Sequence, residues 1–381
     1  MRAAHPLSPH AFSTLRRLTA LTAVMTLALT MGSCSIGESN GDPVISSLTA
    51  QKADDTVPRN SKSDMDNEPL SSAVGTVSMI TSDENRKKGA VSGDMTTTVV
   101  SRERSTDKFQ WAVSIKPAVA NQKRTEYADN AQSAMSENMD LSSTGSAVVS
   151  PDGRYLSLIL LPAEQQSGET AADLRTHIVV LDTTTGKTVR NATVSGIVLG
   201  QALTNSTLAV ETAQNYFPAG SGKGTITTFS LTDTSAQPSS FPTDKWLVGA
   251  TRESFMLAPS LLPDDCFNEC SIMTTVSLLN TDGSTAGSIS GVTAVHPGGW
   301  IHRVADPKSD EQQLVNPSIK KTIDITGKRT FERGVSTGPG LLVEQKSPDG
   351  KGSTESKPAF WLSSSDDGHP HTENLEQFEN H

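Results

Sequence analysis

The segment from Gly145 to Lys187 constrains the fold of this chain most, because three apolar runs in it are separated by tight-turn sequences. The first turn, Ser150–Gly153, reads Ser-Pro-Asp-Gly. Proline presets its own backbone angle there, and glycine accepts a positive one. The second turn, Asp182–Gly186, follows an apolar run and leads into the next extended run. The segment therefore predicts an antiparallel sheet of about four strands.

Weaker copies of this unit follow along the chain. In each copy the third strand is expected to end in an apolar residue just before a turn; these residues are Leu181, Leu231, Leu279, Ile325 and Leu362. A spacing of about 40 to 50 residues per four-stranded unit is typical of a β-propeller blade. Because one blade cannot cover both of its apolar faces, we expect the blades to stack around an axis and to shield one another from water.

We therefore predict an all-β chain in which residues 73–381 form a β-propeller of about six four-stranded blades, with seven as the alternative. Strands at Val74–Ile80, Thr96–Val100 and Phe109–Ile115 are expected to add a blade before the clearest unit. The last copy is short. We expect the first N-terminal strand to complete it, as a clasp that joins the two ends of the ring.

The turn at Ser150–Tyr155 reads Ser-Pro-Asp-Gly-Arg-Tyr, and the turn at Leu181–Lys187 reads Leu-Asp-Thr-Thr-Thr-Gly-Lys. In these two turns the chain resembles the extracytoplasmic propellers of the TolB-like, surface-layer and quinoprotein-like class. The resemblance is clear over about residues 145–195 and weaker elsewhere. It implies a fold and no activity, because the shared motifs are turns and strand ends.

The N-terminus has the features of an export signal. Arg16 and Arg17 precede an apolar run, Leu18–Thr30, that is too short to span a bilayer comfortably as a helix. The sequence Met-Gly-Ser-Cys that ends at Cys34 resembles the lipobox of bacterial lipoproteins. This resemblance implies a signal peptide over residues 1–33, a lipid on Cys34 and a location on the extracytoplasmic face of the cell membrane. Ordinary cleavage near a free Cys34, or a retained anchor, are the alternatives.

Two further segments interrupt the strand pattern. Residues 34–72 are rich in polar residues and have no periodicity, so we predict a disordered tether that cannot bury enough apolar surface to offset the entropy of ordering. In Val119–Asp140, apolar residues recur every four positions, at Tyr127, Ala131, Met135 and Met139. This spacing predicts a helical insertion that packs on the propeller. A partner-binding helix and a disordered segment are the alternatives.

Cys266 and Cys270 lie close together in the segment that begins at Pro263. If Cys34 carries a lipid, these two are the remaining pair in an exported protein, and the pattern predicts a small loop disulfide. Free thiols are one alternative, and a redox or metal pair is another. A redox pair would normally precede a helix, whereas a strand is expected here. A zinc site would need two more ligands, and no histidine lies nearby.

No residue pattern predicts a catalytic, cofactor or metal site. The Gly-rich run Ala219–Thr225 lacks the first glycine of a phosphate loop, since Phe217 stands there, and a strand follows in place of a helix. His369, His371 and His381 are interpreted as solvated C-terminal residues, and His296 and His302 as turn or rim residues. The net charge of -10 disfavours nucleic acid as a partner, because phosphate binding needs a basic surface.

These features favour a membrane-tethered propeller that binds a protein or another envelope component without catalysing a reaction. An extracytoplasmic enzyme with its active site at the propeller channel is the alternative, because each blade contributes only one or two loop residues to such a site. A quinone-dependent dehydrogenase is a third hypothesis, and it would need a tryptophan and charged residues along the axis. A cluster of charged residues at one channel mouth would favour an enzyme. A polar or apolar rim would favour the binding protein.

Overall fold

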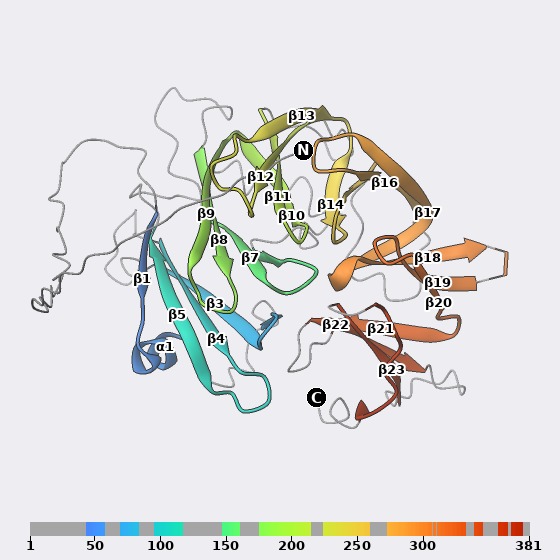
Figure 1. Ribbon diagram of the computed structural model, residues 1–381, viewed down its shortest axis with the longest axis horizontal. Coiled ribbons are helices and arrows are strands. Elements are labelled where there is room, and N and C mark those ends of the chain that lie inside the picture. The colour runs from blue at the N-terminus through green and yellow to red at the C-terminus, as the bar shows by residue number, and fades with distance from the viewer. Residues whose placement is uncertain are drawn as a thin grey trace, which may run out of the picture. The chain divides into compact units, whose positions relative to one another are not determined.

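The computed structural model is built almost entirely from antiparallel strands (Figure 1). It describes residues 43–57, 69–83, 95–116, 147–160, 175–214, 224–259, 273–306, 308–309, 311–332, 339–345, 357–364 and 367–375. Within these residues, α1 (Ala50–Thr56) is the one α-helix. The predicted all-β class is confirmed. No helix in this part of the chain has the length and apolar character needed to cross a membrane.

Five hydrogen-bonded sheets follow one another along the sequence, and we number them 1 to 5. Sheet 1 contains β1 (Val44–Ser47), β2 (Leu70–Ser71), β3 (Thr76–Asp83), β4 (Met95–Arg102) and β5 (Phe109–Lys116). Sheet 2 contains β6 (Ala147–Val149), β7 (Tyr155–Ile159), β8 (Arg175–Asp182) and β9 (Thr188–Ser195). Sheet 3 contains β10 (Ile197–Leu203), β11 (Thr207–Ala213), β12 (Gly224–Ser230) and β13 (Ser239–Thr243).

Sheet 4 contains β14 (Trp246–Ala250), β15 (Phe255–Ala258), β16 (Thr274–Leu279), β17 (Thr285–His296), β18 (Trp300–Asp306), β19 (Glu311–Asn316) and β20 (Lys321–Asp324). Sheet 5 contains β21 (Lys328–Glu332), β22 (Gly340–Gln345) and β23 (Lys357–Ser363). Sheet 4 is long because β17 pairs with β16 through its first half and with β18 through its second half. One strand thus serves two neighbouring units, and the prediction of six or seven blades stays a prediction.

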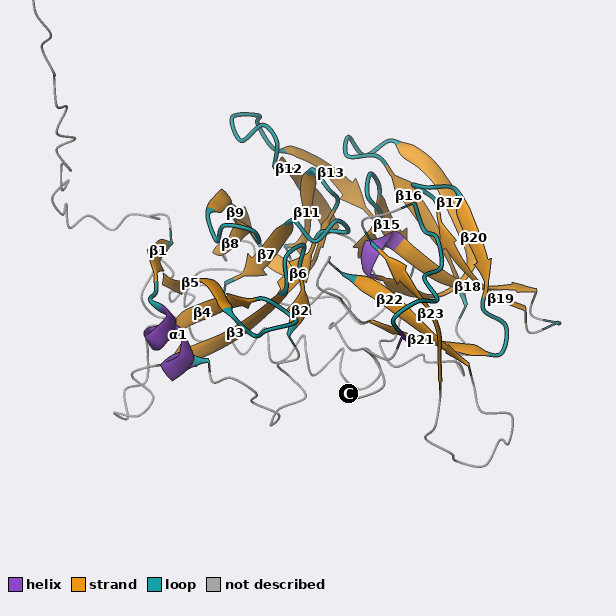
Figure 2. Cartoon of the chain, turned by 60° about the horizontal axis from the view of Figure 1, so that its bottom comes forward, coloured by secondary structure: helices purple, strands orange, loops and turns teal. Residues whose placement is uncertain are grey.

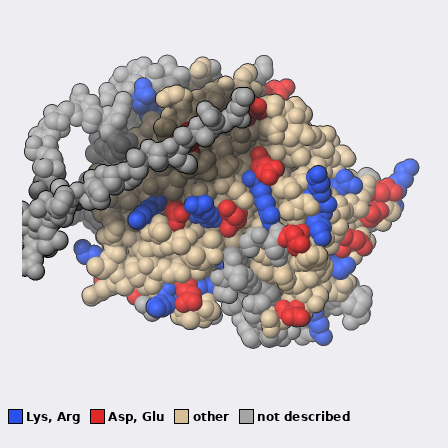
Figure 3. All heavy atoms as spheres, viewed as in Figure 1, with Lys and Arg blue, Asp and Glu red and all other residues tan. Residues whose placement is uncertain are grey.

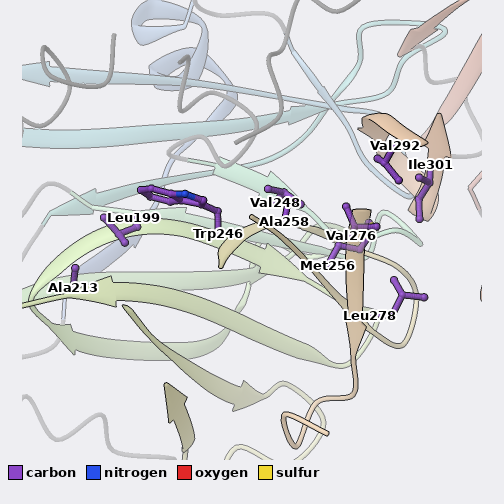
Figure 4. Packing of buried hydrophobic residues seen from close by; sticks show 10 residues of the cluster. All are labelled: Leu199, Ala213, Trp246, Val248, Met256, Ala258, Val276, Leu278, Val292 and Ile301. Atoms are coloured by element: carbon purple, nitrogen blue, oxygen red, sulfur yellow. The ribbon is translucent and has the colours of Figure 1, made fainter. Parts of the chain in front are cut away.

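Each sheet buries a face against the next sheet in the sequence. One buried cluster joins Trp111 of sheet 1 to Leu156 of sheet 2, and another joins Val180 of sheet 2 to Leu208 of sheet 3. Sheets 3 and 4 share the cluster around Trp246, in which Leu199 and Ala213 come from sheet 3 (Figure 4). Sheets 4 and 5 share a cluster that contains Trp300 and Leu341, among others.

This packing explains the sequence of the central strands. Every residue of β11 is buried, which is expected of a strand covered on both faces. By contrast, β9 alternates between buried and exposed residues in its second half, as expected for a strand at the edge of sheet 2. The sheets are therefore mutually dependent, because each apolar face is covered by a neighbouring sheet.

The two predicted turns of sheet 2 form as expected and contact neighbouring segments. The carboxylate of Asp182 accepts hydrogen bonds from the backbone N–H groups of Thr184 and Thr185, both at 3.0 Å. Gly186 has a φ of 67°, and a side chain there would clash with the ring of Trp111 in sheet 1. The indole N–H of Trp111 donates to the carbonyl of Thr183 at 2.7 Å. The turn therefore fastens sheet 2 to sheet 1.

The prediction of a disordered tether over residues 34–72 is wrong for Val44–Thr56. There β1 pairs with β5, and α1 packs on sheet 1 through the buried Ala53 (Figure 2). The Asp54 carboxylate lies 2.5 Å from the guanidinium of Arg102, which is buried. The average composition of residues 34–72 does not predict these contacts. A few apolar positions and one ion pair suffice to order a short helix against an existing sheet.

The predicted clasp between the chain ends also differs from the structure. The first strand, β1, extends sheet 1, and sheet 5 has three strands within the described part of the chain. The outer strand of sheet 5 is met by the C-terminal segment, where Trp361 and His371 exchange backbone hydrogen bonds of 2.9 and 2.8 Å. His371 is thus part of a backbone bridge, and it is exposed, in agreement with its interpretation as a solvated C-terminal residue. The predicted helix at Val119–Asp140 lies outside the described residues.

Candidate functional site

Buried hydroxyl residues shape the first hairpin turn of three sheets. Ser150, Thr204 and Thr251 stand just after β6, β10 and β14, and each is at most 1% exposed. The Ser150 hydroxyl accepts from Tyr155 N–H, and the Thr204 and Thr251 hydroxyls accept from N–H groups two or three residues further along. These buried hydroxyl groups are not among the residues predicted from the sequence. A Ser or Thr directly before each short hairpin was the available signal.

These turns are hydrogen-bonded to one another across the sheets. Asp152 N–H donates to the side-chain oxygen of Asn205 at 3.1 Å, and Asn205 N–H donates to the carbonyl of Arg252 at 3.0 Å. The guanidinium of Arg252 then donates to the carbonyl of Ser364 at 2.7 Å. Sheets 2, 3, 4 and 5 are therefore tied together at one end by their own turns.

A cavity of about 1150 Å³ lies between sheets 3 and 4 and reaches the end of β9. This volume is slightly above the usual range for ligand sites, which reaches about 1,000 Å³. Most of its polar wall is made of hydroxyl side chains, with an apolar part formed by residues such as Phe241, Leu257 and Leu279. The hydroxyl residues are Thr193, Ser195, Thr212, Thr225, Thr227, Thr243, Ser277 and Thr285. Among the described residues, neither histidine nor cysteine contributes to the wall.

Lys245 and Asp244 are the charged residues among the described residues of this wall. Lys245 is half-buried between β13 and β14, and its ammonium donates to the hydroxyl of Ser277 on β16 at 2.7 Å. Asp244 is exposed. The cationic group therefore lies over sheet 4, held by one hydroxyl.

Glu211 lies at the same junction between sheets 3 and 4 and is 1% exposed. Its Oε2 accepts a hydrogen bond from Leu247 N–H on β14 at 2.8 Å, whereas its Oε1 is buried and has no hydrogen-bond partner among the described residues. Burial raises the pKa of Glu211 to about 7, although the bond from Leu247 opposes this shift. A Cβ on Gly224, which lines the cavity, would lie 3.0 Å from Oε1.

The structure does not describe the sequence-predicted site residues. Cys34, Cys266 and Cys270 lie outside the described residues, as do Ala219 to Lys223 of the Gly-rich run. The strand expected after that run is confirmed as β12. Within the residues that the structure describes, no three of His, Cys, Asp and Glu come together as a metal site.

His296 ends β17 directly before the turn at Pro297–Gly299, which confirms its interpretation as a turn residue, whereas His302 differs from its interpretation as a turn or rim residue. His302 is buried, and its Nε2 lies 3.3 Å from the side-chain oxygen of Gln312. The rings of His296 and His302 are stacked with centroids 6.2 Å apart, and His296 Nε2 lies 3.3 Å from the Thr330 hydroxyl on β21. These contacts hold β17 and β18 to sheet 5. At the other tail histidine, His369, the ring lies 3.0 Å from the Asp367 carboxylate.

The cavity has the chemistry of a recognition site for a polar ligand. Hydroxyl groups can donate and accept hydrogen bonds, and Lys245 can hold an anionic group. On the face drawn in Figure 3, acidic and basic side chains lie among one another, and the described residues of this face show no patch of a single sign.

Comparison with known proteins gives a fold class only. No protein-family model matches the chain, and no curated protein matches it. It is similar to the β-propeller domain of the Trilobed protease from Pyrococcus furiosus, described with an open velcro topology, at 11% identity and a TM-score of 0.40 over 78% of this chain and 82% of that one. It is also similar to TolB from Acinetobacter baumannii, at 11% identity and a TM-score of 0.32 over 78% of this chain and 64% of that one. These neighbours are β-propellers, in agreement with the predicted class, and at such scores they carry no argument about chemistry.

Proposed function

We propose that this chain is an extracytoplasmic lipoprotein that is anchored to the cell membrane through Cys34 and binds a protein or another envelope component without catalysing a reaction. One observation supports the binding role most: the cavity between sheets 3 and 4 is large, and its wall is mainly neutral hydroxyl and apolar groups. Such a wall recognises a ligand through many hydrogen bonds. The N-terminal lipobox-like sequence supports the anchor, with residues 1–33 as the signal peptide.

An enzyme is the second candidate, and Glu211 is the observation that favours it. Glu211 is a buried carboxyl group with a pKa of about 7, and general acids and bases commonly have a pKa in this range. We favour binding because Glu211 does not line the cavity, and because its Oε2 is engaged by the backbone of Leu247. Lys245, a cationic residue of the wall, bonds to a hydroxyl group, that of Ser277.

Capture of the protein from its own envelope tests the binding role. We expect the full-length chain, tagged at its C-terminus and extracted in mild detergent, to retain one or more companions through washing that mass spectrometry identifies. The matched control is the same chain with Lys245→Met and Thr225→Val, which alters the cavity wall and leaves the N-terminus unchanged. Equal recovery of the same proteins from both chains, or recovery of no companion at all, contradicts the proposal.

The anchor has an independent test. Cells that express the full-length chain and are fed radioactive palmitate should label the protein, and Cys34→Ala should abolish the label and release the protein from the membrane fraction. Cys266→Ala is the control, and it should keep the label. Label that survives Cys34→Ala would exclude this residue as the lipid attachment point.

A further inference from the structure

We propose that the cavity between sheets 3 and 4 binds an acidic saccharide, with a carboxylate of the ligand at Lys245 and the ligand's hydroxyl groups along the rest of the wall. This inference rests on the proposed binding function and names the ligand class of that site. Three observations carry it: an ammonium group in the wall that is held by a hydroxyl group, hydroxyl side chains contributed by three sheets, and an apolar surface at Phe241.

Lys245 supplies the charge that the ligand must match. Its ammonium donates to the Ser277 hydroxyl at 2.7 Å, and both residues line the cavity, so the pair is within reach of a ligand. Among the described residues, no carboxylate forms an ion pair with this ammonium. An ammonium has three N–H donors, so a ligand carboxylate can take a second one without displacing Ser277. A half-buried cation that lacks a counter-charge favours an anionic ligand.

Asp244 limits where the anionic group of the ligand can lie. It is the other charged residue among those that the structure describes in this wall, and it is exposed. Its carboxylate would repel an anionic group placed beside it, whereas the Lys245 ammonium lies at Ser277 on β16. We therefore expect the carboxylate of the ligand on the sheet 4 side of the cavity, and the neutral part of the ligand toward sheets 2 and 3.

The hydroxyl side chains of the wall suit the hydroxyl groups of a saccharide. A hydroxyl group is both a donor and an acceptor, so a protein hydroxyl and a sugar hydroxyl can bond in either direction. Exposed hydroxyl residues come from sheet 2 at Thr193, from sheet 3 at Thr225 and from sheet 4 at Thr285. The cavity volume of about 1150 Å³ is of the size found for drug-sized ligands, which are larger than a monosaccharide.

The residues of β13 favour a saccharide over an extended peptide. The ring of Phe241 is partly buried against the turn after β16, since a Cβ on Gly283 would lie 2.8 Å from it, and its free part offers an apolar surface to the C–H groups of a sugar ring. An extended peptide would instead pair with β13, the edge strand of sheet 3, through backbone hydrogen bonds. Pro242 on this strand has no N–H group to donate.

Titration calorimetry on the full chain tests this inference with three probes. Digalacturonate carries carboxylate and hydroxyl groups, galactobiose carries hydroxyl groups alone, and succinate carries carboxylates without hydroxyl groups. We expect saturable binding of digalacturonate, and at least about tenfold weaker binding of the other two probes, because each lacks one kind of contact.

Variants of the wall separate the two kinds of contact. Lys245→Met should weaken the binding of digalacturonate about tenfold and leave that of galactobiose unchanged. Thr225→Val should weaken the binding of both saccharides about fivefold and leave that of succinate unchanged. Lys187→Met, at an exposed position of the turn between β8 and β9, and Asp244→Asn are matched controls, and neither should weaken the binding of digalacturonate.

Equal affinity of the parent and of Lys245→Met for digalacturonate overturns the inference, and so does the absence of saturable binding to the parent chain. Binding of succinate as tight as that of digalacturonate overturns the saccharide class. The three probes test the contacts on the unmodified protein, so a variant that fails to fold does not remove the test. If envelope companions are captured while digalacturonate is not bound, the inference fails and the proposed function stands. If digalacturonate is bound at Lys245 and cleaved, the saccharide site stands and the non-catalytic proposal fails.

Discussion

Glu211→Gln is expected to abolish a pH dependence of stability. In the parent protein, Glu211 should make the free energy of unfolding fall as the pH rises from about 4 to about 8. The folded-state pKa of Glu211 is raised to about 7 from 4.5, so the folded chain holds the proton more tightly than the unfolded chain does. The stabilisation is therefore complete below the unfolded pKa and is lost as the pH rises to the folded pKa. A shift of this size corresponds to roughly 3 kcal/mol.

Urea unfolding of the parent and the variant at several pH values measures this effect. Glutamine keeps an oxygen that can accept from Leu247 N–H, and it cannot ionise, so its curve should lack this pH dependence. The quantity to compare is the slope of the unfolding free energy against pH. The absolute unfolding free energy is less informative, because the glutamine N–H₂ group can change it by a similar amount at every pH. Parallel curves for the two proteins from about pH 4 to about pH 8 would show that Glu211 has an ordinary pKa.

Trp246→Ala is expected to lower the free energy of unfolding by about 3 to 5 kcal/mol, the range for removing a large buried aromatic side chain. Trp246 is 1% exposed and belongs to the buried cluster with Leu199 of sheet 3 and Met256 of sheet 4 (Figure 4). Loss of the indole would leave a void between the faces of sheets 3 and 4 that this cluster joins.

Chemical denaturation of the full chain measures this loss. Val44→Ala is the control, because Val44 is 60% exposed on β1 and its truncation should change stability by no more than about 0.5 kcal/mol. If Trp246→Ala costs less than about 1 kcal/mol, the faces of sheets 3 and 4 do not depend on each other as described.

The local parts of the fold could be predicted from the sequence because their causes are local. Proline and glycine at Ser150–Gly153 and the aspartate turn at Asp182–Gly186 fix hairpins within a few residues, and sheet 2 forms around them. The apolar run of β8 likewise indicates a strand covered on both faces. Turn chemistry and side-chain alternation both act over short distances.

The candidate site could not be predicted because its parts meet only after the sheets pack. Glu211 reaches Leu247, 36 residues away on the next sheet, and nothing in either local sequence marks the contact. The sharing of β17 between β16 and β18 also has no local cause, since the strand changes partner along its length. The order of Val44–Thr56 depends in the same way on a sheet that comes later in the chain, through Arg102.

Native-state hydrogen exchange of the full chain tests most directly whether each sheet is stable only because its neighbours cover its faces. The slowest amides of β8, β11, β15 and β22 belong to four different sheets. If the sheets depend on one another, these amides should exchange with one common opening free energy, equal to that of global unfolding. Distinct opening free energies, each shared within one sheet and absent from its neighbours, would contradict the account.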